Sequence, residues 1–150
     1  MTWHWYFARA GEIFVDLDSG RKWRCFVRAQ ALPRFVRVEI VPSATIGHYH
    51  VRVELDRDLG EAERIALALH LGTDPLGAQH AMMRLARHIQ PVTCLVTQNA
   101  FSRAADDRCE CATKHDSLSA MLACPAGRTY RSHSTADWYG STPWDVSPWE

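Results

Sequence analysis

The chain has 150 residues, of which 47% are hydrophobic, and its 17 basic and 17 acidic side chains cancel. This length supports one domain with a substantial core and is short for two. Because the net charge is zero, the chain as a whole has no electrostatic field that would hold a nucleic-acid backbone, so such binding would need a local basic patch. Residues 1–42 have a mild basic bias, whereas residues 43–75 lean acidic.

The amino terminus has neither the basic start nor the long apolar stretch of a secretory signal peptide. No run approaches the roughly 18 apolar residues of a membrane span. We therefore expect an intracellular, cytoplasmic protein with no membrane partner. The five cysteines are an odd number, which favours reduced thiols or a metal site over a disulfide framework.

The first part of the chain predicts an antiparallel meander of short strands. Turn signals divide its apolar runs into strands at residues 3–9, 12–18, 23–28, 34–41 and 48–55. Alternation is clearest in the last run, where one face would hold Tyr49, Val51, Val53 and Leu55. The opposite face, wet or functional, would hold His48, His50, Arg52 and Glu54.

Two helices are expected next. Asp58 and Glu61 form a capping-box-like start for a helix that runs to about Leu71. The second helix begins at Pro75, since proline is tolerated at the first helical position, and ends before Pro91.

A further strand over 92–97 is apolar enough to lie at the centre of the sheet, and a short helix is expected over 117–123. The sequence thus predicts an α+β fold. Residues 1–98 would form an antiparallel-rich sheet of five to six strands with a helical pair on one face. Residues 99–150 would form an irregular C-terminal extension, rich in Cys, His and Trp, that packs on the domain or on a partner.

Asp16 and Asp18 are the most suggestive acidic pair. Two positions apart on a strand, their carboxylates project from one face and can jointly bind Mg²⁺ or Mn²⁺, which accept the oxygens of a nucleotide triphosphate. If the strand with His50 lies beside them, His50 and Arg52 would meet those phosphates. The alternative is that Asp-Leu-Asp-Ser-Gly begins a turn, in which Asp and Ser cap backbone amides.

A hydrophobic strand ending in Asp-x-Asp, followed by Ser-x-x-x-Gly-x-x-His at the next strand, resembles the first two motifs of the archaeo-eukaryotic primase superfamily. The resemblance implies a palm domain in which Asp16 and Asp18 bind the catalytic divalent metal. It implies a catalytic and nucleotide-binding role for His50, with Ser43 and Gly47 shaping the nucleotide-binding loop.

The run from Ser43 through His50, Leu71-Gly-Thr-Asp-Pro and Arg84 also looks like small uncharacterised proteins of archaeal viruses and phages. The chain departs from that pattern at Gly77 and Ala81, where the viral proteins have charged residues. The strand over 92–97 also offers no carboxylate for the primase family's third motif. We therefore expect a binding protein or a catalytically degenerate descendant more than a polymerase.

A second candidate site lies near the C-terminus. Zinc takes four thiolate or imidazole ligands, and a structural zinc contributes most where a small irregular region has little core. Its candidate ligands are Cys109, Cys111, His115, Cys124 and His133. Because Cys-x-Cys is a less usual spacing than Cys-x-x-Cys, unligated thiols and surface histidines stay open as the alternative.

Two functions are therefore carried forward. The first is a small viral or mobile-element protein with a primase-like palm that binds nucleotide or nucleic acid, including DNA, with Mg²⁺ or Mn²⁺ as cofactor. The second is a non-enzymatic interaction protein, such as a virion component or an inhibitor of a host complex. In that case the Trp-rich segment 138–150 would dock on a protein partner.

Overall fold

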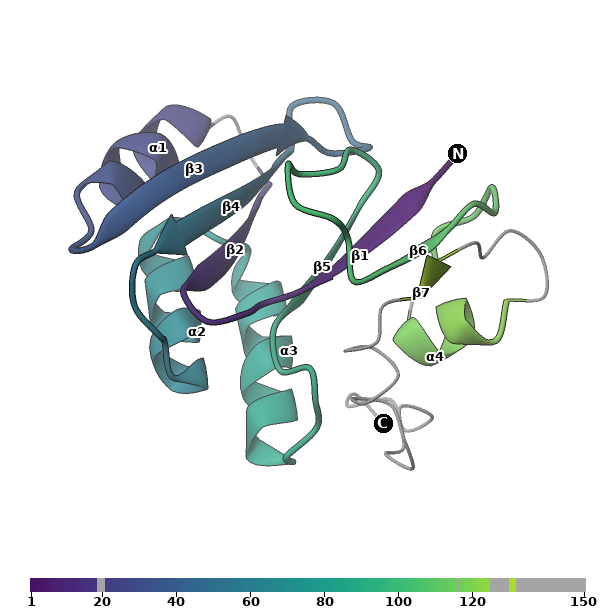
Figure 1. Cartoon of the computed structure of the whole chain (residues 1–150). Helices are drawn as coiled ribbons and strands as arrows, with labels where there is room; N and C mark the ends of the chain where they lie inside the picture. Colours follow the sequence, from purple (N-terminus) through teal and green to yellow (C-terminus); the bar gives the residue numbers. More distant parts are fainter. Residues whose placement is uncertain (19–20, 116, 125–129, 132–150) are drawn as a thin grey trace.

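The computed structural model describes residues 1–18, 21–115, 117–124 and 130–131, which form an α+β fold with two antiparallel sheets (Figure 1). The first sheet has the strand order β2 (Glu12–Leu17), β4 (Tyr49–Leu55), β3 (Phe35–Pro42). The second has the order β5 (Cys94–Thr97), β1 (Trp3–Phe7), β6 (Asp107–Cys109), β7 (Tyr130–Arg131). The α+β class is confirmed, but the strands divide between two sheets instead of forming one.

The prediction of a strand at residues 23–28 is wrong, because this segment is part of helix α1 (Lys22–Gln30). Cys25 and Ala29 are buried, and their spacing of four places both on the side of α1 that faces the core. The bulky residues Trp23 and Val27, which favour strands, lie on the exposed side. Burial of the small residues therefore decides the conformation against local strand propensity.

The predicted helical pair is present as α2 (Glu61–His70) and α3 (Pro75–Ala86), which pack against each other (Figure 1). Proline stands at the first turn of α3, and the Asp74 side chain caps the helix by accepting from the Leu76 amide. Arg64 ties α2 to the turn between β1 and β2, since its guanidinium donates to the carbonyls of Ala10 and Glu12.

The two faces of the three-stranded sheet differ. One face forms the larger core and packs under α1 and α2 through Ile13, Val15, Leu17, Val51, Val53 and Leu55. This confirms the face predicted from the alternation in β4. The other face is covered at its centre, where Phe14 packs against Tyr6 and Phe101 of the second sheet and its loop.

The second sheet corrects two predictions. Strand β5 lies at its edge, not at its centre, because β1 pairs with β5 on one side and with β6 on the other. For the same reason β1 does not continue into a meander with β2. Phe101 and Asp106, from the segment predicted as an extension, are buried in the fold.

Helix α4 (Leu118–Leu122) lies within the predicted segment 117–123, and its cap is Ser117, whose hydroxyl accepts from the Ala120 amide. The described part of the chain contains no helix that is both long and apolar enough to cross a membrane.

Candidate functional site

The register of β2 and β4 brings the predicted acidic pair beside two histidines. Asp16 lies directly opposite His50, and the Asp16 Oδ1 is 3.5 Å from the His50 Nε2. The Asp18 Oδ1 is 3.5 Å from the His48 Nδ1. Asp16 and His50 are a directly paired couple of β2 and β4, so their side chains lie on one face of the sheet, and Asp18 and His48 follow just past the ends of the two strands. The pairing of Asp16 with His50 places these two predicted residues on one face, whereas the predicted metal and nucleotide roles of Asp16, Asp18 and His50 stay predictions.

The electrostatics of this cluster are unfavourable for its negative charges. Burial, together with the carboxylates of Asp18 and Asp74, raises the pKa of Asp16 to about 6. Lys114 and His48 act in the opposite direction without cancelling that rise. An uncompensated group of carboxylates is a common feature of cation-binding sites.

His50 is held neutral. Burial, with help from the charges of Lys114 and His48, lowers its pKa to about 4. The residue is 8% exposed, and within the described ranges its Nδ1 is buried without a hydrogen-bond partner. A buried neutral imidazole with an unsatisfied nitrogen can accept a hydrogen bond from a ligand, donate one to it, or bind a metal.

Two groups near this cluster were not among the predicted site residues. Asp74 is anchored to β2, because its amide donates to the Asp16 carbonyl at 2.8 Å while the Asp16 amide donates to Thr73 Oγ1 at 3.0 Å. Lys114, from the loop after β6, is close enough to influence the pKa of both Asp16 and His50. Asp74 had a clear signal as a helix cap before Pro75, but only the tertiary fold brings it to Asp16.

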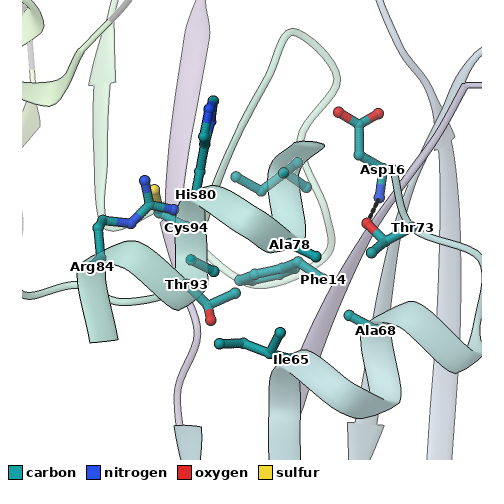
Figure 2. Close-up of a pocket in the computed structure, with 13 residues that line it drawn as sticks. Phe14, Asp16, Ile65, Ala68, Thr73, Ala78, His80, Arg84, Thr93 and Cys94 are labelled. Atoms are coloured by element: carbon teal, nitrogen blue, oxygen red, sulfur yellow. Dashed lines mark hydrogen bonds between the residues drawn. The ribbon is translucent and has the colours of Figure 1, made fainter. Parts of the chain in front are cut away.

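A pocket of about 200 Å³ opens beside Asp16, between β2, β5, α2 and α3 (Figure 2). Its walls are mainly apolar, and Figure 2 shows the Phe14 ring lying across it between Ala78 and Ile65. Its polar lining includes Asp16, Thr73, His80 and Arg84. Apolar walls with a few polar groups are typical of sites for small organic ligands.

Ser43 and Gly47 lie in the loop between β3 and β4 and contribute to its conformation. The Ser43 amide donates to the His48 carbonyl at 3.0 Å, and the Ser43 hydroxyl accepts from the Thr45 amide. Gly47 has a φ of +83°, a left-handed conformation that favours glycine. A contact between this loop and a nucleotide stays a prediction.

Arg52 occupies a different environment from His50, although both lie on the same face of β4. Its guanidinium pairs with the carboxylates of Glu12, Glu39 and Glu54. Glu12 also accepts two hydrogen bonds from Arg103, and these two arginines lower the pKa of Glu12 against the effect of burial. The predicted contact of Arg52 with phosphate stays a prediction, but the structure already engages this side chain with three carboxylates.

The C-terminal cluster converges as well. The ligand atoms of four side chains all lie within 4.8 Å of one another, namely those of Cys109, Cys111, His115 and Cys124. The His115 Nε2 is 3.5 Å from the Cys109 Sγ and 3.0 Å from the Cys111 Sγ. Tetrahedral zinc, with bonds of about 2.0 to 2.3 Å, separates its ligand atoms by about 3.5 to 3.8 Å. The cluster can therefore hold a metal such as zinc, whereas His133, the fifth predicted ligand, lies outside the described residues.

Comparison with protein-family models, with curated proteins and with solved structures finds no match to this chain. The resemblance to the primase superfamily therefore stays a prediction. Function has to be inferred from the arrangement of the side chains.

Proposed function

We propose that the protein binds a divalent cation, Mg²⁺ or Mn²⁺, through Asp16 and Asp18, and that this cation holds the phosphates of a nucleotide beside His50. The observation that carries the proposal is the register of β2 and β4, which sets Asp16 against His50, together with the approach of the Asp18 carboxylate to His48 just past the strand ends. Asp16 and His50 are on strands of one sheet, so their backbones are held by a rigid frame, and Asp18 follows directly after β2.

The charges of the cluster support a cation there. Asp16 is destabilised as an anion by burial and, to a smaller extent, by Asp18 and Asp74, and a divalent cation beside these carboxylates would relieve the repulsion. Carboxylate oxygens are the ligands that Mg²⁺ and Mn²⁺ prefer. The buried, unpartnered Nδ1 of His50 is the observation that fits a bound ligand, because a native site seldom leaves such an atom unsatisfied.

The adjoining pocket supports a nucleotide as the ligand of the cation. The mainly apolar walls suit the faces of a planar base, while Thr73, His80 and Arg84 provide polar groups. The proposal concerns binding and includes no polymerisation step, because β5 has the sequence Cys-Leu-Val-Thr and so supplies no carboxylate.

The proposal is tested by equilibrium binding of a fluorescent nucleoside triphosphate with and without Mn²⁺. We expect binding that depends on Mn²⁺ and is lost in Asp16→Asn and Asp18→Asn. Asp56→Asn is the matched control, because Asp56 is an exposed carboxylate whose partner is Arg34. Equal binding by Asp16→Asn and wild type, with the fold verified by circular dichroism, would refute the proposed site.

The second proposal is a structural zinc ion held by Cys109, Cys111, His115 and Cys124. Around it the core is small, because among the residues that the structure describes the buried cluster at this point consists of Trp5, Phe7, Cys109 and Met121. In such a region the free energy of metal binding becomes free energy of folding. The observation that favours zinc is the convergence of three thiols and one imidazole, a common ligand set of structural zinc sites.

Metal analysis of the purified protein should give one zinc per chain, and Cys111→Ser should lower this content. Cys25→Ala is the control, since Cys25 is buried in the other core beneath α1 and should leave the zinc content unchanged. A wild-type protein that contains no zinc, and takes none up when refolded with it, would exclude this site. The alternative of a protein partner bound by segment 138–150 lies outside the described residues and stays a prediction.

A further inference from the structure

The outer face of α1 exposes a large aromatic side chain that the core does not use. Trp23 is 72% exposed and Val27 is 56% exposed, although both are large and apolar. They line a shallow, open hollow on the surface together with Arg21, Arg24 and Arg28. We call these five residues the α1 outer face.

The Trp23 side chain packs against Phe26, three residues later on the same helix. Its ring stacks on Phe26, with centroids 5.4 Å apart and an angle of 5° between the planes. Phe26 is half-buried, and Cys25 and Ala29 anchor the helix to the core. The indole therefore presents a flat face to solvent on a supported surface, so a stacking ligand would pay little to order it.

The charged residues of α1 and its N-cap are all basic. The segment from Arg21 to Gln30 contains four basic residues and no acidic residue, in a chain whose net charge is zero. Across the part of the chain that the structure describes, no ion pair is formed by Arg21 or Arg24. Positive charges near a helix N-terminus oppose the helix dipole, and a bound anion would compensate them.

We infer that the α1 outer face binds single-stranded nucleic acid, with a base stacked on Trp23 and the phosphate backbone along Arg21 and Arg24. Aromatic rings that stack bases, combined with a basic groove that follows the backbone, are how proteins bind single strands without sequence preference. Bases are available for such stacking only when they are not paired in a duplex. This inference stands on a different surface from the proposed cation site and does not depend on it.

The charge of the face decides against a second copy of the chain as the occupant. A two-fold dimer would set this patch against itself, and its three arginines, Arg21, Arg24 and Arg28, would repel those of the second copy. Nucleic acid satisfies both properties of the face, because its bases match the indole and its phosphates match the guanidinium groups.

The test is fluorescence anisotropy of labelled single-stranded DNA and RNA oligonucleotides at several salt concentrations, without added Mg²⁺ or Mn²⁺. Wild type should bind, and Trp23→Ala should weaken binding by about 5- to 150-fold, as expected for about 1 to 3 kcal/mol of stacking. Arg24→Gln should lower the slope of log affinity against log salt by about 0.7, as one lost phosphate contact predicts.

Met82→Ala and Arg57→Gln are the matched controls. Met82 is 46% exposed on α3, and Arg57 is a surface arginine paired with Glu63, so neither substitution should change the affinity by much. Trp23→Ala should also retain Mn²⁺-dependent nucleotide binding, which separates failure of this inference from failure of the proposed cation site.

Three results would overturn the inference. The first is no binding of either oligonucleotide by wild type at low salt. The second is unchanged affinity of Trp23→Ala for the strand that wild type binds. The third is a Trp23-dependent complex with an acidic protein in place of the oligonucleotides, which would make the α1 outer face a protein-binding surface.

Discussion

Two ends of the same sheet face, only a few residues apart on β2 and β4, have opposite electrostatic characters. At one end Glu12 is neutralised by Arg52 and Arg103, and its pKa is lowered. At the other end Asp16 has like charges nearby, and burial raises its pKa to about 6. Both acids are on one strand and share a face.

The difference separates a structural network from a candidate binding site. Buried charges that stabilise a fold are paired, as around Glu12. Carboxylates gathered without a matching arginine, as around Asp16, need another source of positive charge, which a divalent cation can supply. The two ends should therefore respond to substitution in opposite ways.

The largest effect is expected at the paired end. Arg52→Met removes the cation from between three carboxylates and should lower the free energy of unfolding by about 3 to 5 kcal/mol, measured by urea denaturation. Arg37→Met is the control, because Arg37 makes a partly exposed pair with Glu54 and should cost less than about 1 kcal/mol. Lost nucleotide binding with unchanged stability would instead support the predicted phosphate contact of Arg52.

At the other end, Asp16→Asn should weaken the binding of Mn²⁺ measured by isothermal titration calorimetry. Loss of a group next to a metal ligand costs about 10- to 100-fold in affinity, so loss of a direct ligand should cost at least about tenfold. Because Asp16 is destabilised as an anion, the same variant should raise the midpoint of thermal unfolding at pH 8 without metal. A lower midpoint would show that Asp16 belongs to a stabilising network like that of Glu12.

The pH dependence gives a third comparison. The pKa of Asp16 rises from 3.8 to about 6 on folding, so the folded state holds a proton between these values that the unfolded state has lost. The contribution of Asp16 to stability therefore falls as the pH rises through this range. The advantage of Asp16→Asn over wild type, measured by denaturation, should be full above about pH 6 and vanish near pH 4. An advantage independent of pH would contradict the raised pKa.

The smallest effect is expected from Lys114. This residue directly precedes His115 of the cysteine cluster, and its charge acts on Asp16. Lys114→Gln should raise the pKa of Asp16 further, because the lysine charge lowers it. It should also strengthen Mn²⁺ binding at neutral pH by a few fold, since a like charge near the cation is removed. Nuclear magnetic resonance titration of the Asp16 carboxyl carbon measures the first effect. Lys22→Gln is the control. It removes a lysine of α1 whose ammonium group lies over the ring of Tyr49 on β4.

Part of this site could be predicted from the sequence because strands alternate strictly. The pattern of β2 sends Asp16 to one face, and the pattern of β4 does the same for His50. The roles of neighbouring residues could not be predicted in this way. Arg52 shares the face of His50, but its partner Glu39 lies on β3, whose register with β4 is set by tertiary packing.

The fold shows the same limit. Helix α1 has no side-chain cap at its N-terminus, and its Trp and Val residues favour strands, so only the burial of Cys25 and Ala29 reveals it. The cysteine cluster was predictable as a set of residue types, but its convergence depends on α4 folding back toward β6. Local pattern identifies the chemistry, and tertiary structure decides which groups meet.

The most direct measurement is anomalous diffraction at the manganese edge from crystals grown with Mn²⁺ and a nucleoside triphosphate. The proposed site predicts a manganese ion bonded to carboxylate oxygens of Asp16 and Asp18, with nucleotide phosphate on its open side near His50. Manganese found only elsewhere, or a nucleotide bound away from β2 and β4, would contradict it.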